Sequence, residues 1–139
     1  ISLLGNVLAR QMSADHGALE TIMFRDGWLT EAAASNVWIV KDGAFLGPPK
    51  SEHVLEGIRV ELLHELCEEE GIAYNLKPIS EADVRSADEL LLSSATKEVL
   101  AVTRLDGEAV GHGAMRGKVG PVYARLHEAY QRAKALQSI

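Results

Sequence analysis

The residues best suited to chemistry fall in three short segments, residues 30–36, 55–59 and 92–96. The first reads TEAAASN and places the carboxylate of Glu31 beside small side chains, which let a flat ring approach the backbone closely. The second reads LEGIR, and at the start of a helix its free backbone N–H groups and its glycine would make an anion site. The third reads LSSAT, whose hydroxyl and amide groups could hold a second face of the same phosphate.

Each segment taken alone also has an ordinary structural interpretation. Glu31 fits a solvated carboxylate in a turn, because most glutamates lie at the surface. Residues 55–59 fit the plain start of an amphipathic helix, and residues 92–96 fit a turn stabilised by Ser and Thr side chains. The three segments therefore point to phosphate chemistry only when they are considered together.

The sequence gives little support for a metal site, a disulfide, a nucleophilic serine or a nucleotide-binding loop. The histidines do not pair with other ligand types at the spacing of a zinc site, and we predict no metal. They are His16, His53, His64, His112 and His127. Cys67 is the single cysteine, so neither an intrachain disulfide nor a multi-cysteine zinc site can form. It falls on the buried side of a predicted helix, where we expect a small apolar side chain. Neither a Gly-x-Ser-x-Gly elbow nor a Walker loop occurs.

Length and composition predict one globular domain. The chain has 139 residues, of which 47% are apolar and 24% charged, as is typical of globular domains. Fourteen basic and twenty acidic residues give a net charge of −6, which argues against binding to a nucleic-acid backbone. We expect no membrane segment, because no apolar run reaches the roughly 18 residues that span a bilayer. The single cysteine suits the cytoplasm, and we expect that location.

Apolar residues at helical spacing predict three main helices. The first covers residues 1–15, where apolar side chains recur three and four positions apart. The second covers residues 54–70 and has the strongest helical period. The third begins at Pro121, a residue favoured in the first turn of a helix. A short helix is expected after Ser80, which resembles an N-cap.

The rest of the chain predicts strands joined by tight turns. The expected strands are residues 20–24, 28–30, 37–40, 44–46, 72–79, 89–94, 99–105 and 108–110. Asp-Gly pairs at 26–27, 42–43 and 106–107 are strong signals for tight hairpin turns. Residues 37–40 are apolar throughout, which predicts a strand buried on both faces. The sequence therefore predicts one mixed α/β domain rich in antiparallel hairpins.

Residues 29–38, 55–59 and 90–99 resemble, in order and spacing, three motifs of the class IV aminotransferases. These are the fold-type IV pyridoxal-phosphate enzymes. The resemblance is greatest to D-amino-acid aminotransferases, with branched-chain aminotransferases and aminodeoxychorismate lyase as sister possibilities. It implies a mixed α/β (α+β) fold for residues 1–139, the C-terminal large domain, with an antiparallel-rich curved sheet or pseudo-barrel and flanking helices. It also implies pyridoxal 5′-phosphate as cofactor, an amino acid and a 2-oxo acid as substrates, and a homodimer.

The resemblance implies a role for each matching residue. Glu31 matches the carboxylate that pairs with the pyridine nitrogen, and Leu55 the apolar side chain against the ring face. Gly57 permits close approach of the phosphate to the backbone. Ile58 and Arg59 match the pair whose backbone amides bind that phosphate.

The second phosphate segment matches less completely. Ser94 and Ala95 are implied to bind phosphate, and the amides of Ala95 and Thr96 lie in a region matched to the substrate carboxylate. Ala95 stands where many relatives have threonine, so only its backbone contact carries over, and Ser94 or Thr96 would supply the hydroxyl. Arg59 also replaces a common threonine, and the alanines of residues 32–34 replace a Gly/Ser-rich run.

The Schiff-base lysine of the family has no counterpart in this chain. The alignment places it just upstream of Ile1, and none of the lysines present falls at a matching position. They are Lys41, Lys50, Lys77, Lys97, Lys118 and Lys134. The N-terminal small domain is expected to be missing as well, so we expect the chain alone to be inactive. The alternative from another class is a non-catalytic binding or assembly fragment.

Overall fold

The computed structural model describes residues 7–14, 19–32, 36–48, 58–94 and 98–137. Within these ranges the strands are β1 (Val7–Ala14), β2 (Leu19–Arg25), β3 (Trp28–Ala32), β4 (Asn36–Lys41), β5 (Ala44–Gly47), β6 (Tyr74–Leu76), β7 (Glu89–Ser94), β8 (Glu98–Leu105) and β9 (Glu108–Ala109). The helices are α1 (Ile58–Glu70), α2 (Glu81–Arg85) and α3 (Pro121–Gln137), with a 3₁₀ turn at Gly113–Met115.

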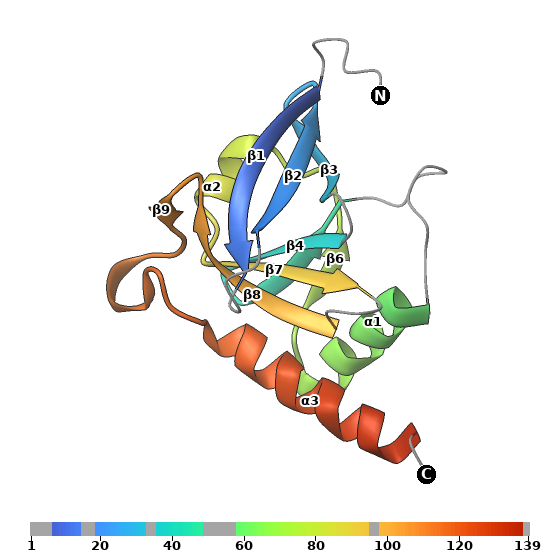
Figure 1. The fold of residues 1–139 in the computed structure, drawn as a ribbon. Helices are drawn as coiled ribbons and strands as arrows, with labels where there is room; N and C mark the ends of the chain where they lie inside the picture. The colour runs from blue at the N-terminus through green and yellow to red at the C-terminus, as the bar shows by residue number, and fades with distance from the viewer. Residues whose placement is uncertain (1–6, 15–18, 33–35, 49–57, 95–97, 138–139) are drawn as a thin grey trace.

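The strands form one sheet that closes into a barrel-like shape (Figure 1). Its order is β3-β2-β1-β8-β7-β4-β5-β6, with β9 beside β8, and only β5 and β6 of the described pairs are parallel. The edge strand β3 is linked to the segment that follows β6. Leu29 donates a backbone hydrogen bond to Ile79 at 2.7 Å, and Glu81 donates one to Gly27 at 3.1 Å. These bonds confirm the predicted pseudo-barrel with its antiparallel-rich sheet.

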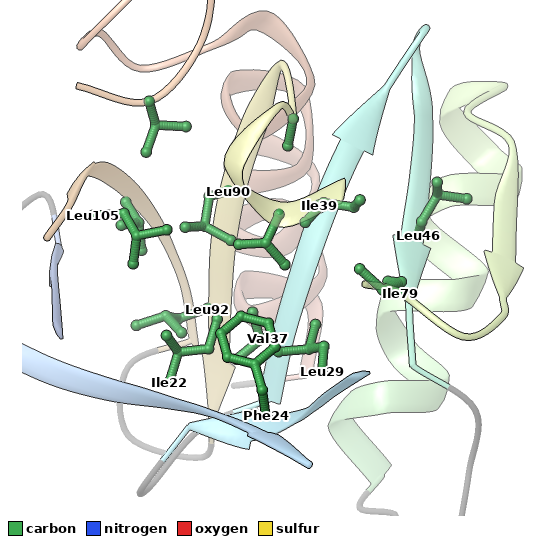
Figure 2. Packing of buried hydrophobic residues seen from close by; sticks show 14 of the residues in the cluster. Ile22, Phe24, Leu29, Val37, Ile39, Leu46, Ile79, Leu90, Leu92 and Leu105 are labelled. Carbon is green, nitrogen blue, oxygen red and sulfur yellow. The ribbon is translucent and has the colours of Figure 1, made fainter. Parts of the chain in front are cut away.

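The central strands are buried on both faces because each face has its own apolar core. Successive side chains of a strand point to opposite faces, so alternate residues enter different cores. On β4, Val37 and Ile39 enter the barrel interior, which Figure 2 shows, whereas Trp38 and Val40 pack under the helices. The interior also takes Leu90, Leu92, Leu100 and Val102, and the helix side takes Leu91, Val99 and Ala101. The predicted two-sided burial of residues 37–40 is confirmed.

Most of the predicted local elements are present. All three Asp-Gly turns have both residues at positive φ, with Asp26 at 53° and Gly27 at 82° as an example, which is the backbone of a type I′ hairpin turn. Helix α2 begins with a capping box, in which Ser80 and Asp83 each accept a backbone hydrogen bond from the other. The strand predicted at residues 72–79 is shorter than expected and ends before Pro78. Helix α1 is described from Ile58 onward, and residues 54–57 lie outside the described ranges.

The predicted helix over residues 1–15 is wrong where the structure describes it. Val7–Ala14 is strand β1, which pairs with β2 from Val7 opposite Arg25 to Ser13 opposite Leu19. It also pairs with the end of β8, and the register shifts between Ser13 and Ala14. Apolar spacing of three and four fits a helix, but pairing on both sides gives this segment's backbone groups partners in the sheet. Tertiary context therefore overrides the local pattern.

A buried carboxylate joins the sheet to the last helix. Glu89, at the start of β7, is 7% exposed and accepts hydrogen bonds from the backbone N–H groups of Val122 at 3.0 Å and Tyr123 at 2.9 Å. These N–H groups lie in the first turn of α3 and have no partner within the helix. A Cβ atom on Gly120 would lie 2.1 Å from Cδ of Glu89, so the approach requires glycine there. Glu89 thus caps α3 from another element.

Replacing Glu89 by alanine is expected to destabilise the domain by about 1–3 kcal/mol, because the N–H groups of Val122 and Tyr123 would be left buried without partners. The free energy of unfolding in urea measures the loss. Glu65→Ala is the matched control, since Glu65 is exposed on α1. Equal stabilities of the two variants would contradict the capping role.

Burial also predicts a pH dependence of stability through Glu89. Desolvation raises the pKa of this carboxyl above its ordinary value of 4.5, and the two backbone N–H groups only partly offset the effect. The folded state then binds more protons than the unfolded chain. The contribution of Glu89 is fully present below pH 4.5 and is lost as the pH rises through the raised pKa. The stability advantage of the wild type over Glu89→Gln should therefore shrink with rising pH in urea unfolding, and a constant or growing advantage would contradict this.

Candidate functional site

The sheet places the ends of several strands together at one edge. Because β4 runs antiparallel to both β5 and β7, those two strands end where β4 begins. Asn36, the first residue of β4, lies opposite Ser93, and Ser94 is the last residue of β7. We call this edge, marked by Asn36, Gly47 and Ser94, the site edge.

Helix α1 begins at the site edge because of the topology around it. It connects the parallel strands β5 and β6, so it crosses back over the sheet antiparallel to both. Phe45, near the start of β5, donates a backbone hydrogen bond to Ala73 at 2.8 Å, which fixes the chain just after α1 at the far edge. The first residues of α1, Ile58 and Arg59, therefore lie toward the site edge. In Figure 1 the arrowhead of β7 points toward α1, and the two elements are in contact.

Glu31 reaches the same edge through strand β3. Its backbone pairs with Met23 on β2, one residue before β3 ends at Ala32. Asn36 follows Ala32 by four positions, so their Cα atoms can be at most about 14 Å apart. The segment that carries Glu31 thus ends close to the start of β4.

The structure therefore gathers part of the predicted site and leaves part of it outside the described ranges. The backbones of Glu31, Ile58, Arg59 and Ser94 approach one edge of the sheet. Leu55, Gly57, Ala95 and Thr96 lie outside the described ranges. A helix N-terminus and the end of a strand at one edge offer backbone donors suited to a phosphate. The described backbone is therefore compatible with a phosphate-bearing ligand at the site edge.

Sequence reasoning missed a buried polar pair at this edge. Trp38 on β4 donates its indole N–H to Oγ of Ser93 on β7 at 2.8 Å, and both side chains are 3% exposed. A buried tryptophan normally finds an acceptor for its N–H, which was the available signal. Its partner could not be identified without the strand register.

A cavity lies along strands β4, β5 and β6. It measures about 300 Å³ and is lined by Ile39, Lys41, Asp42, Ala44, Leu46, Asn75, Lys77 and Asp83. Lys41 ends β4 and Ala44 begins β5, away from the site edge, whereas Lys77 donates a backbone hydrogen bond to Gly47 at 2.9 Å. The lining of the cavity therefore extends from the far end of these strands to the end of β5 that marks the site edge.

Within the described ranges, no group of three His, Cys, Asp or Glu side chains could hold a metal ion. Cys67 is fully buried, and burial raises the pKa of its thiol to about 12. The thiolate that reacts with electrophiles is therefore scarce, which confirms the interpretation of Cys67 as a small apolar core residue. No described helix has the length and apolar character needed to cross a bilayer.

A barrel-like, mainly antiparallel sheet with helices α1 and α3 on one side and phosphate-binding candidates at one edge defines a domain of the fold-type IV kind. The family model for class IV amino-transferases matches residues 1–105, and the chain belongs to this family. The cofactor of the family is pyridoxal 5′-phosphate. The resemblance to the class IV aminotransferases is thus confirmed.

Two curated relatives are named D-alanine aminotransferases. The chain is 37% identical over 132 residues to a D-alanine aminotransferase of Staphylococcus haemolyticus, covering 95% of this chain and 45% of that protein. It is 35% identical over 133 residues to one of Bacillus licheniformis, covering 96% and 46%. The chain thus spans less than half the length of these relatives.

A solved structure shows the same fold. A branched-chain amino acid aminotransferase of Escherichia coli is 32% identical, with a TM-score of 0.75 over 84% of this chain and 38% of that one. Another branched-chain aminotransferase, solved with pyridoxamine 5′-phosphate, is 27% identical, with a TM-score of 0.70 over 78% and 34%.

Proposed function

We propose that this chain is the cofactor-binding, C-terminal domain of a D-amino-acid aminotransferase. The observation that carries the proposal is the convergence at the site edge of the three segments that bear the family motifs. The ends of β3 and β7 and the start of α1 are far apart in sequence. The register of β4 with β7 and the β5–α1–β6 crossover support their meeting at one edge. The names of the curated relatives support the D-amino-acid specificity.

Different residues of the chain would contact the ring and the phosphate of pyridoxal phosphate. When bound, the cofactor supplies a ring that accepts negative charge from the substrate carbon. The carboxylate of Glu31 would keep a proton on the pyridine nitrogen through a charge-assisted hydrogen bond, and Leu55 would pack on the ring face. Backbone N–H groups of Ile58 and Arg59 would bind the phosphate, helped by the positive end of the α1 dipole.

The β7–β8 connection would supply the other side of the site. Ser94 would donate its hydroxyl to the phosphate, and the amide of Ala95 would add a backbone contact. The amides of Ala95 and Thr96 would also hold the substrate carboxylate. Because the motif threonine is replaced by alanine at position 95, we propose that Ser94 or Thr96 provides the hydroxyl.

The lysine that carries protons between substrate and cofactor is proposed to come from sequence upstream of Ile1. Of the lysines the structure describes, Lys41 and Lys77 line the cavity along β4, β5 and β6. Lys118 precedes α3 and Lys134 lies in its last turn. The proposed whole protein acts on an amino acid and a 2-oxo acid as a cytoplasmic homodimer.

Cofactor binding tests the proposal directly. Pyridoxal phosphate should bind the chain saturably in equilibrium dialysis, and Glu31→Gln should raise its Kd about 10- to 100-fold, because a charge-assisted hydrogen bond to the ring nitrogen is lost. The control is Glu65→Gln, at an exposed position on α1. Absence of saturable binding would favour the non-catalytic interaction fragment. Equal Kd values for the two variants would overturn the role of Glu31.

Branched-chain aminotransferase is the second candidate, and the solved structures favour it. We expect the chain alone to show no sustained amino transfer from D-alanine to 2-oxoglutarate, since no matching lysine is present. Sustained turnover would contradict this.

In a protein extended upstream through the lysine, D-alanine should be the better donor. Preference for L-leucine would establish the second candidate, and pyruvate release without a keto-acid acceptor would indicate an aminodeoxychorismate lyase.

A further inference from the structure

We infer that Trp38 is a positioning residue for the phosphate-binding segment, acting through the hydroxyl of Ser93. The inference rests on the function proposed above, because it concerns how that site holds its phosphate. Trp38 and Ser93 are 55 positions apart in the sequence and belong to neighbouring strands. Both lie within the segments that resemble family motifs, but the resemblance implies no individual role for either of them.

The hydrogen bond lies beside the start of β4 and the end of β7, which meet at the site edge. Ser93 belongs to the second phosphate segment, residues 92–96, and is directly followed by Ser94, where β7 ends. Trp38 is the third residue of β4, just after the connection from the strand that carries Glu31. In the register Ser93 lies opposite Asn36, so Trp38 reaches it diagonally on the same face. The bond therefore ties one cofactor segment to the strand that follows the other.

The indole ring is held in a fixed orientation by its surroundings. Trp38 stacks on Phe45 with ring centroids 4.8 Å apart, and Tyr74 lies 5.8 Å away. Gly47 packs so closely on the ring that a Cβ atom there would lie 2.4 Å from two of its carbons. A ring confined in this way presents its N–H in one direction, and Ser93 Oγ lies in that direction at 2.8 Å.

This arrangement gives the Ser93 hydroxyl a defined direction. A serine hydroxyl carries one donor hydrogen and two acceptor lone pairs. Because the indole N–H occupies an acceptor position of Ser93, the hydroxyl hydrogen is directed away from Trp38. Both side chains lie on the helix side of the sheet, the side on which α1 packs against β7. The pair thus holds the end of β7 in a fixed position. It does so on the helix side of the sheet, where α1 begins.

The test compares two probes that differ only in the phosphate. Trp38→Phe keeps an aromatic ring and removes the N–H donor. Its Kd for pyridoxal 5′-phosphate should rise about tenfold, the value of one hydrogen bond of ordinary strength. Its Kd for pyridoxal, which lacks the phosphate, should stay at the wild-type value. Trp28→Phe is the matched control, since Trp28 is 50% exposed at the start of β3, and both of its Kd values should match the wild type.

Ser93 provides the second pair of variants. Ser93→Ala should show the same selective loss of pyridoxal-phosphate affinity, and Ser93→Thr, which keeps the hydroxyl, should restore it. Urea unfolding of each variant gives its stability separately, and the affinities are compared under conditions where each variant is folded. These variants test the inference even if Trp38→Phe does not fold.

The outcomes separate the inference from the proposed function. If the wild type binds pyridoxal phosphate but Trp38→Phe and Ser93→Ala do so equally well, the inference is wrong and the proposed function stands. If the variants lose affinity for both probes in parallel, the hydrogen bond only supports the fold, and the inference is again wrong. If the wild type shows no saturable binding of either probe, the proposed function fails and the inference fails with it.

Discussion

The parallel pairing of β5 and β6 is the constraint on which the site depends. Two adjacent parallel strands cannot be joined by a tight turn, so the chain must cross back over the sheet, and α1 makes that crossing. The crossover fixes the direction of the helix, and its N-terminus is therefore brought to the edge where β7 ends. Helix α3 holds α1 in place, with Arg132 of α3 3.1 Å from the carboxylate of Glu70 at the end of α1.

The second requirement is a sheet that can be buried on both faces. Strands β4, β7 and β8 supply apolar side chains to the barrel interior and to the layer under the helices. Polar groups in such strands need partners, and the structure provides them at both ends of β7. Glu89 caps α3 at one end, and Ser93 accepts the indole N–H of Trp38 at the other. These polar contacts connect the helices and the site edge to a core that is otherwise apolar.

Family membership and the position of the motifs support one another without depending on the same observation. The class IV match and the relatives rest on the sequence, whereas the convergence at the site edge follows from strand register and helix direction.

The sequence by itself predicted most of the local elements and singled out the candidate residues of the site. The Asp-Gly turns, the Ser80 capping box, the Pro121 helix start and the motif around Glu31 depend on neighbours a few positions away. Only the tertiary structure decided that residues 7–14 form a strand, because their apolar spacing suits a helix until β2 and β8 offer pairing partners. It likewise decided the Trp38–Ser93 bond and the Glu89 cap, since each joins residues whose proximity depends on register and long-range packing.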